Sequence, residues 1–287
     1  MLITKTYHDV PSKLSGGRPA RIFIIAPSLP NYPQAREIYQ VTGPVERFAG
    51  QIASHGYVVG EHLFEPDLEG AAPSPLISRE ACPSSFHEFE GPEPIPYDAE
   101  GTDRGNKYKI EKELAAYDED ATLSIDLLCS LSSCNGRIAA TGMCLGGHLA
   151  FRAAFDSRVL SSVCFFATDI HSATLGKGKN DDTLVRVRNG DLKGKGELVM
   201  IFGKQDTHVP RSGRDLIRNT LEDADVPTSF LEVQAQHAFI RDESSKGRWD
   251  AALTRSLFSF MVEVFERTVG RDLGPRVEQG GEIAHIC

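Results

Sequence analysis

The feature that most constrains this chain is the segment 139–148, which reads AATGMCLGGH. A short apolar run, 138–141, leads into a Gly-x-Cys-x-Gly turn, and a segment typical of a helix, 149–155, follows at once. Such a sharp strand-to-helix turn explains why a glycine lies two residues before the cysteine and another two residues after it. A side chain at Gly142 or Gly146 would clash with the bent backbone. The cysteine between these glycines would then lie at a helix N-terminus, where backbone N–H groups favour a thiolate and a developing oxyanion.

The cysteine of this turn, Cys144, has two interpretations. The motif is short, and an unpaired cysteine is often a small core residue. It also matches the nucleophile turn of the α/β hydrolases, with sulfur in place of the usual serine oxygen. In those enzymes an Asp and then a His follow the nucleophile in the chain, each after a later strand. The rest of the sequence therefore decides between the two interpretations.

Composition excludes several classes of protein. The 287 residues carry a formal charge of −9, so nothing supplies the basic stripe of a nucleic-acid binder. The longest apolar runs are too short to cross a bilayer, and the first residues lack a secretory signal, so we expect no membrane partner. Without disulfide-like spacing, the cysteines favour a reducing cytoplasm; they occupy positions 82, 129, 134, 144, 164 and 287.

Strand-like and helix-like segments alternate along most of the chain. This pattern predicts right-handed βαβ crossovers, and hence an α/β fold of one domain over 1–287 with a mostly parallel central sheet flanked by helices. The predicted strands are 21–26, 57–63, 138–141, 162–168, 197–202 and 228–233. The predicted helices are 43–56, 106–133, 149–155, 211–224 and 249–269.

Four segments fall outside this alternation. Residues 1–19 are polar and predict a loose or edge-strand lead-in, and 270–287 is a polar tail. The segment 171–196, rich in Gly, Lys and Asp, predicts a loop. The segment 65–105 has seven prolines and no sustained period. Its aromatic residues favour a folded flap over a pocket rather than a linker; they are Phe86, Phe89 and Tyr97.

Two later strand ends carry the residues that a cysteine nucleophile needs. Asp206 follows the strand 197–202, and His237 follows the strand 228–233. In a triad Cys144 would attack, His237 would shuttle the proton, and Asp206 would fix the imidazole tautomer. Taken singly, Asp206 could be a turn residue and His237 an ordinary loop histidine. All three at the expected strand ends favour the triad, and His208 is then a surface residue or a neighbour of the triad.

Four motifs resemble the dienelactone hydrolases (carboxymethylenebutenolidases) over roughly residues 20–265. They are GMCLGG at 142–147, EIYQVT at 37–42, HAFIR at 237–241, and Arg104 four residues before the pair Tyr108-Lys109. The family patterns are Gly-x-Cys-x-Gly-Gly, Glu-Ile-Phe-Gly-Val-Asn, His-Ser-Phe-Ala-Arg and Arg-x-x-x-Tyr-Lys. Gln40 and Ala238 depart from them, since the family has Gly and Ser at those positions.

The resemblance implies how the thiol is activated and how the oxyanion is bound. Glu37 would contact the resting thiol and help to convert it to thiolate when substrate arrives. The backbone N–H groups of Ile38 and Leu145 would form the oxyanion hole. From the residues alone, Glu37 could equally be a carboxylate near a helix N-terminus.

The resemblance also implies a substrate site. Arg104 and Arg241 would hold a substrate carboxylate, with Tyr108 as a further substrate-binding residue. A guanidinium suits a carboxylate because it donates two parallel hydrogen bonds. Arg241 lies near the predicted base, but either arginine could also be a surface charge.

These observations predict a hydrolase of small carboxylic esters or lactones that forms an acyl-thioester at Cys144. We expect no cofactor and no metal, a small substrate that carries a carboxylate, and a monomer or weak homodimer. The alternative is a non-catalytic member of the fold, a binding or thiol-redox protein whose Cys144 is liganded or oxidised. Asp206 behind His237 favours the hydrolase, because a binding protein does not need it.

Overall fold

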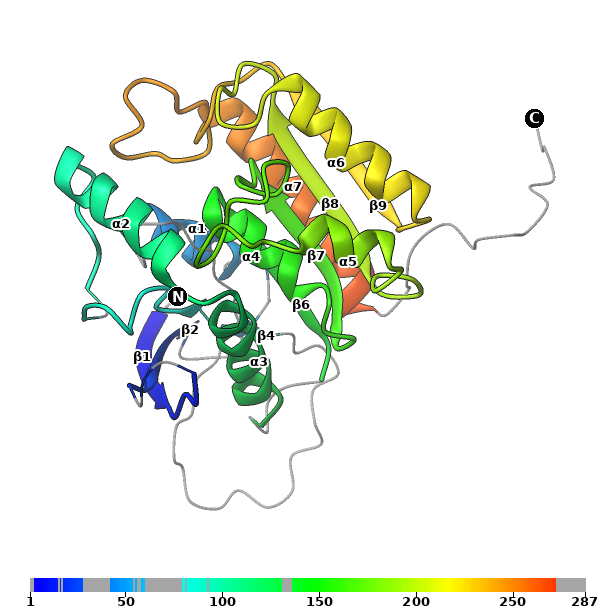
Figure 1. The fold of residues 1–287 in the computed structure, drawn as a ribbon. Coiled ribbons are helices and arrows are strands. Elements are labelled where there is room, and N and C mark those ends of the chain that lie inside the picture. The colour runs from blue at the N-terminus through cyan, green and yellow to red at the C-terminus, as the bar shows by residue number, and fades with distance from the viewer. Residues whose placement is uncertain are drawn as a thin grey trace, which may run out of the picture.

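The fold is built on a parallel sheet. A computed structural model describes residues 3–14, 16, 18–27, 42–53, 55, 58–59, 79–80, 82–91, 93–130 and 136–271. Six strands form the central sheet in the order β3-β4-β6-β7-β8-β9, and every neighbouring pair is parallel (Figure 1). The strands are β3 (Val58–Val59), β4 (Arg79–Glu80), β6 (Ile138–Met143), β7 (Val159–Phe165), β8 (Glu197–Gly203) and β9 (Thr228–Val233). The predicted α/β fold with a mostly parallel central sheet is confirmed.

A second sheet is antiparallel and begins before the central one in the chain. It contains β1 (Ile3–Val10), β2 (Ala20–Pro27) and β5 (Cys82–Pro83), in that order. β1 pairs with β2 along its whole length, from Ile3 opposite Pro27 to Val10 opposite Ala20. The polar start of the chain therefore contributes an edge strand.

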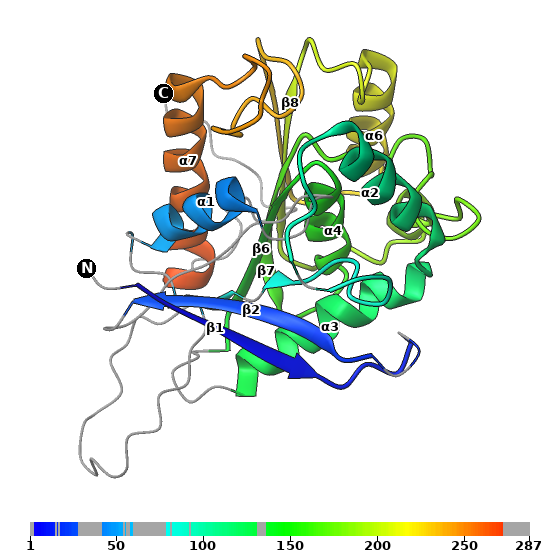
Figure 2. The same cartoon turned by 90° about the vertical axis from the view of Figure 1, so that its left-hand side faces the viewer.

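Helices cover both faces of the central sheet (Figure 2). One face carries α1 (Gly43–Ala53) and α7 (Ala251–Phe265), which continues into a π-helical turn (Glu266–Gly270). The other face carries α4 (Leu145–Ala153), α5 (Thr183–Arg188) and α6 (Arg211–Asp223). No helix in the described ranges is long and apolar enough to cross a membrane.

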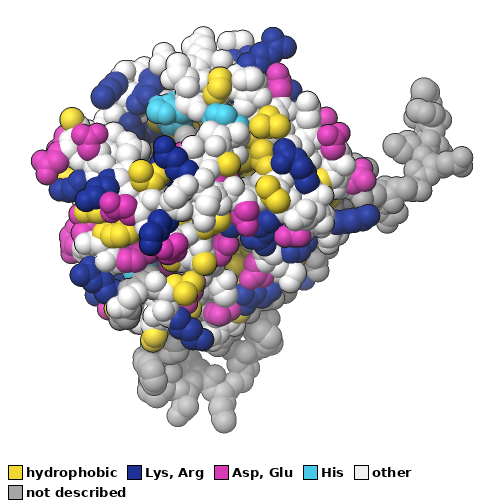
Figure 3. All heavy atoms as spheres, viewed as in Figure 1, with side chains coloured by type: hydrophobic (Ala, Val, Ile, Leu, Met, Phe, Trp, Pro, Cys, Tyr) yellow, Lys and Arg dark blue, Asp and Glu magenta, His cyan; other side chains and the backbone are white. Residues whose placement is uncertain are grey.

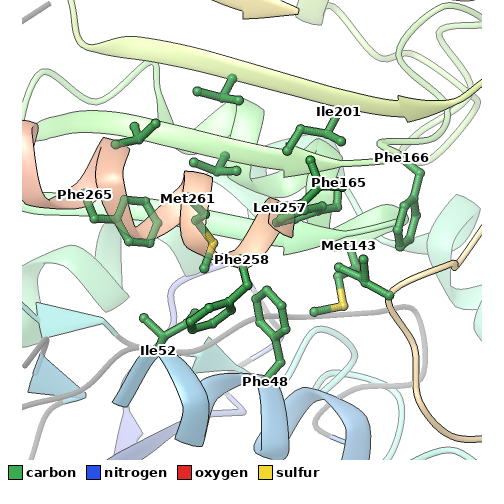
Figure 4. Close-up of a cluster of buried hydrophobic side chains, with 14 of the residues drawn as sticks. Phe48, Ile52, Met143, Phe165, Phe166, Ile201, Leu257, Phe258, Met261 and Phe265 are labelled. Carbon is green, nitrogen blue, oxygen red and sulfur yellow. The ribbon is translucent and has the colours of Figure 1, made fainter. Parts of the chain in front are cut away.

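The hydrophobic core occupies both sides of the central sheet. Along β7, Val163 and Phe165 pack with α1 and α7, whereas Cys164 packs on the side of α4. Figure 4 shows Phe48 of α1 next to Phe258 of α7, and their ring centroids are 5.5 Å apart in an edge-to-face arrangement. All residues of β8 are buried. Because a parallel strand is covered on both faces, the sequence of β8 is a nearly continuous apolar run.

The predicted helix 106–133 is two helices, α2 (Ala99–Glu111) and α3 (Leu114–Ser130). Asp98 caps α2 by accepting a hydrogen bond from the Gly101 N–H at 2.7 Å, so the last part of the predicted loop 65–105 is helical. Lys112 separates the helices with an extended backbone, and its side chain is fully buried. Its ammonium group contacts Glu88 at 2.6 Å and Asp120 at 2.7 Å.

The prediction of a loop over 171–196 is wrong for its central part, where α5 forms. Leu184 and Val187 of this short helix are buried in the cluster between the sheet and α6. The surrounding Gly, Lys and Asp residues conceal this apolar pair in the sequence. Short helices depend on packing rather than on intrinsic propensity, which composition does not reveal.

The buried lysine gives a testable prediction of stability. Lys112→Met should lower the free energy of unfolding by about 3–5 kcal/mol, because it leaves Asp120 and Glu88 with an uncompensated buried charge. Lys107→Met is the matched control, in the helix α2 that ends just before Lys112. Lys107 is 64% exposed and pairs with Glu111 at 3.9 Å, so its replacement should cost less than about 1 kcal/mol. Urea denaturation of both variants measures the difference, and equal losses would contradict the prediction.

Candidate active site

The carboxyl edge of the central sheet carries a pocket of about 740 Å³. Loops after β6, β7, β8 and β9 all reach it, because parallel strands end at the same edge. Cys144, Thr168, His208 and His237 are among the residues that line it. Figure 3 shows histidine side chains on this face of the molecule with lysine and arginine side chains around them.

Cys144 lies at the turn between β6 and α4 in an unusual backbone conformation. Its φ is +57° and its ψ is −120°, a region that residues with a side chain rarely adopt. A Cβ atom on Gly142 would lie 2.1 Å from the carbonyl oxygen of Gly146, so the prediction that Gly142 must be a glycine is confirmed. A second contact of this kind involves Gly147, whose added Cβ would lie 2.7 Å from the Phe165 carbonyl oxygen.

The first turn of α4 begins directly after Cys144. Leu145 is its first residue and is fully buried. The N–H groups of a first helical turn have no acceptor within the helix, so that of Leu145 is available beside the cysteine. Glu37 and Ile38, the other residues predicted to act on the thiol and the oxyanion, lie outside the described residues.

His237 and Asp206 form a buried hydrogen-bonded pair. Nδ1 of His237 lies 2.7 Å from Oδ2 of Asp206. The backbone N–H of His208 donates to the other oxygen of Asp206 at 2.8 Å, which fixes the plane of the carboxylate. With Nδ1 held in this way, Nε2 is the nitrogen that remains for proton transfer.

Neighbouring charges and burial shift the pKa values of His237 and Asp206. Burial lowers the pKa of His237, but the negative charges of Cys144 and Asp206 and their hydrogen bonds outweigh it and raise the pKa to about 9. Burial raises the pKa of Asp206, and the hydrogen bond and charge of His237 reverse this effect and hold it below its ordinary value. A carboxylate and an imidazolium are therefore favoured together at neutral pH.

Aromatic and imidazole rings enclose His237. The Phe166 ring lies edge-on at 4.9 Å and the exposed His208 ring lies 4.3 Å away, both measured between centroids. Phe166 also corrects the predicted strand 162–168, since β7 ends at Phe165 and Phe166 has a φ of +36°. The apolar run continues past the strand because Phe166 supports the imidazole rather than the sheet.

Arg241 lies in the pocket, as the resemblance implied. It is only 7% exposed, and its guanidinium lies 4.5 Å from the centroid of the Tyr97 ring. One of its nitrogens donates to the Ser244 carbonyl oxygen at 3.0 Å. Tyr97 comes from the segment predicted to form a flap, so part of that segment lines the pocket. Ala238, the departure from the family pattern, also lines it.

Arg104 and Tyr108 do not line this pocket. The Arg104 guanidinium lies 3.7 Å from Glu90 and 3.5 Å from Glu100. The Tyr108 hydroxyl donates to Glu90 at 3.2 Å, and its ring stacks on Phe89 with centroids 4.8 Å apart. That these two residues bind substrate stays a prediction from the resemblance.

Helical periodicity explains why α2 lines the pocket with a different face from the one that carries Arg104 and Tyr108. Thr102, Asn106 and Lys109 line the pocket, and their spacing of four and three places them on one face. Arg104 and Tyr108 lie four apart on another face. The motif Arg-x-x-x-Tyr-Lys thus brings its lysine to the pocket, and sequence reasoning missed that residue.

Two further pocket residues were not predicted, and both follow β7. The Thr168 hydroxyl oxygen lies 3.9 Å from the Cys144 sulfur, within reach of a hydrogen bond to sulfur. Asp169 has a φ of +66°, and both of its carboxylate oxygens accept hydrogen bonds from Lys109, at 3.0 and 3.1 Å. The signal in the sequence is a Thr-Asp pair directly after an apolar run, at the carboxyl end of the strand beside the nucleophile strand.

Comparison with known proteins identifies the family of the chain. The sequence pattern of the dienelactone hydrolase family matches residues 35–269. The chain belongs to the dienelactone hydrolase family. It is 50% identical over 297 residues to a Saccharomyces cerevisiae protein named "Putative carboxymethylenebutenolidase", and the match covers 100% of both chains.

Solved structures share the fold of this dienelactone hydrolase family member. A Klebsiella pneumoniae protein described as "Putative Dienelactone Hydrolase" has a TM-score of 0.69 at 16% identity, with 93% of this chain and 100% of that chain covered. A dienelactone hydrolase-like promiscuous phosphotriesterase from metagenomic libraries has a TM-score of 0.64 at 13% identity, covering 93% and 99%.

Family membership makes this protein a carboxylic ester hydrolase. In the part of the chain that the structure describes, no group of His, Cys, Asp and Glu side chains is arranged to hold a metal ion.

The pKa of His237 gives the next prediction. NMR titration of the imidazole should give a midpoint near pH 9 in the intact protein, and Cys144→Ala should lower it because the negative charge of the sulfur is lost. The sign of the shift also fixes its effect on stability. The raised pKa contributes stability that is complete below about pH 6.5 and is lost as the pH rises through about 9. A midpoint near 6.5 in both proteins would contradict the prediction.

Proposed function

We propose that this protein hydrolyses small carboxylic esters or lactones with Cys144 as nucleophile, His237 as general acid and base, and Asp206 as the group that orients His237. One observation carries the proposal. The cysteine occupies the strained turn between β6 and α4, and a buried histidine whose Nδ1 is bound to a carboxylate at 2.7 Å lines the same pocket. This is the arrangement of nucleophile, base and orienting acid that acyl transfer requires.

The reaction starts from the thiolate of Cys144, with the proton of the thiol held by His237 as an imidazolium. Free thiols are only a few per cent ionised at neutral pH, so a cysteine nucleophile needs such a base. The thiolate attacks the ester carbonyl carbon, and the oxyanion that forms then collapses to a thioester as His237 donates its proton to the leaving alkoxide. Water next attacks the thioester and gives its proton to His237, which releases the acid and restores the thiolate beside the imidazolium.

Backbone donors would stabilise the oxyanion. Leu145 is the first residue of α4 and directly follows Cys144, and a backbone donor at this position favours the developing charge. The family resemblance supplies Ile38 as the second donor and Glu37 as the residue that helps to form the thiolate. Those two roles rest on the resemblance alone.

The pocket supports a substrate that carries a carboxylate, such as a dienelactone. Arg241 is nearly buried against the face of Tyr97, so its guanidinium is held in a fixed orientation at the pocket wall. A preorganised guanidinium binds a carboxylate with two hydrogen bonds at low entropic cost. The yeast relative is named for carboxymethylenebutenolide, a lactone of this kind.

The thiol-redox alternative needs a resolving cysteine near Cys144. Among the cysteines whose side chains the structure describes, the other free ones are Cys129 and Cys164. Cys164 is fully buried on the side of β7 that packs against α4, and burial raises the pKa of its thiol far above the ordinary value. Cys129 is exposed on α3. Neither favours the redox function over hydrolysis.

The test is hydrolysis of cis- and trans-dienelactone, a plain lactone and p-nitrophenyl acetate by the wild type, Cys144→Ala and His237→Ala. Both variants should lose about three orders of magnitude or more in kcat, because removal of either member disables the same unit. His208→Ala is the control, since its ring touches His237 without being the proton carrier, and it should lose much less. Turnover that survives Cys144→Ala would contradict the proposal.

A second test addresses the carboxylate. Arg241→Gln should raise KM for a carboxylate-bearing lactone by about 10- to 100-fold, the value of a hydrogen bond to a charged group, and change hydrolysis of p-nitrophenyl acetate little. Arg104→Gln is the matched control, because that guanidinium pairs with Glu90 and Glu100 away from the pocket. If Arg104→Gln raises KM and Arg241→Gln does not, the carboxylate binds elsewhere.

A further inference from the structure

Lys109 and Asp169 form an ion pair in the wall of the pocket. The lysine comes from α2 and the aspartate from the loop after β7, and both line the pocket together with Cys144. The ammonium nitrogen lies 3.0 and 3.1 Å from the two carboxylate oxygens. The side chains are 17% and 10% exposed, so solvent reaches only a small part of the pair. The accessible part therefore belongs to the pocket wall.

The loop after β7 holds Asp169 in place through its backbone and its side chain. The φ of Asp169 is +66°, which is uncommon for a residue other than glycine. Thr174 bonds to it twice, with its hydroxyl to the carboxylate at 2.7 Å and with its backbone N–H to the carbonyl oxygen at 3.2 Å. The Gly176 N–H of the same loop donates to the Lys109 carbonyl oxygen at 3.2 Å. Both charges are therefore fixed in position before a substrate arrives.

The pair keeps a donor and an acceptor for a ligand. An ammonium group has three N–H groups, and the two bonds to Asp169 use no more than two of them. A carboxylate offers about four acceptor positions. Among the described hydrogen bonds, one oxygen of Asp169 accepts from Lys109 and Thr174, and the other oxygen accepts from Lys109. One N–H of the lysine and an acceptor position of the aspartate therefore lie next to each other.

The charges of the pair determine which chemical group suits this position. Burial raises the pKa of Asp169, but the charge of Lys109 and the hydrogen bonds that the carboxylate accepts outweigh it and hold this pKa below its ordinary value. The carboxylate repels a second anion, and the ammonium group repels a cation. A hydroxyl donates one hydrogen bond and accepts others, so it can bond to both partners without separating them. Hydrogen bonds to charged partners are also the stronger ones.

We propose that Lys109 and Asp169 bind a hydroxyl group of the substrate, so that the ester or lactone carries a hydroxyl as well as a carboxylate. The hydroxyl oxygen accepts from the ammonium group of Lys109, and its hydrogen is donated to Asp169. Arg241, in the loop after β9, takes the carboxylate, so separate elements recognise the two groups. The inference rests on the proposed function, because that function makes the pocket the substrate site.

The experiment measures binding rather than turnover. In Cys144→Ala, which cannot form the thioester, calorimetry gives the Kd of monomethyl succinate and of the two monomethyl esters of malate. The malate esters carry one added hydroxyl, next to the ester or next to the acid. At least one of them should bind about 10- to 100-fold tighter than monomethyl succinate, because it gains hydrogen bonds to charged groups. Lys109→Met/Asp169→Asn in the same background should lose most of this advantage.

The double variant removes both charges together, so neither is left buried without its partner. Asparagine also tolerates the positive φ at position 169. Lys177→Met/Glu113→Gln is the matched control. This ion pair, at 2.6 Å, joins the same loop to the residues between α2 and α3, but its side chains are 64% and 54% exposed and are not among the described residues that line the pocket. The control should keep the advantage of the malate esters.

A single variant tests the role of charge. Asp169→Asn leaves the ammonium group of Lys109 without its neutralising partner, so the position should now accept an anion. The half-ester that carries a second carboxylate in place of the hydroxyl should bind about ten-fold tighter to Asp169→Asn than to the Cys144→Ala background, because it gains a hydrogen bond to a charged group. An ion pair with a structural role alone would change stability without creating this affinity.

Four results would overturn the inference. They are malate esters that bind no tighter than monomethyl succinate, an advantage that persists in Lys109→Met/Asp169→Asn, an advantage that is also lost in Lys177→Met/Glu113→Gln, and no gain for the second carboxylate in Asp169→Asn. Hydrolysis that survives Cys144→Ala would instead overturn the proposed function. Turnover and Kd thus distinguish the two failures.

Discussion

The close approach of two backbone segments at the end of β6 is the constraint on which the site depends. Gly142 lies so near the carbonyl of Gly146 that no side chain fits between them, and Cys144 takes a φ of +57° as a result. Such a conformation costs on the order of 1–3 kcal/mol and persists only when its surroundings fix it. Here β7 fixes it, because the Phe165 carbonyl accepts the Cys144 N–H at 3.0 Å.

The parallel sheet supplies the remaining groups of the site. Since β6, β7, β8 and β9 run in the same direction, four loops that are distant in the sequence meet at one edge. β7 contributes Phe166 and Thr168, while β8 and β9 are followed by Asp206 and His237. Helices bury both faces of the sheet, so these strands are rigid supports. They hold Asp206 and His237, which interact through their charges, in fixed positions.

Sequence reasoning predicted those parts of the molecule that local pattern determines. The strands 197–202 and 228–233 were located to within a residue of β8 and β9, because buried parallel strands are apolar runs bounded by turns. It mislocated the end of β7, because Phe166 continues the apolar run while serving the site. It merged α2 and α3, because a lysine in a helical pattern looks exposed until its buried partners are known.

The same distinction holds for the site residues, since local pattern predicts some of them and tertiary packing determines the others. Cys144, Asp206 and His237 each follow a strand, so their positions could be predicted from the order of the strands. The orientation of α2 could not, because Arg104 and Lys109 lie on the same helix and only tertiary packing decides which of them faces the pocket. The motif therefore marks a helix that lines the pocket, while its arginine and tyrosine lie on another face of that helix.

The most direct test of the account is to trap the acyl-enzyme. The protein is mixed with an ester substrate, quenched in acid within the first turnovers and digested, and the peptide that contains Cys144 is weighed. The account predicts an added acyl group on this peptide that disappears as the substrate is consumed. Turnover of the same ester with the acyl group on another residue, or with none on Cys144 under conditions that preserve a thioester, would contradict it.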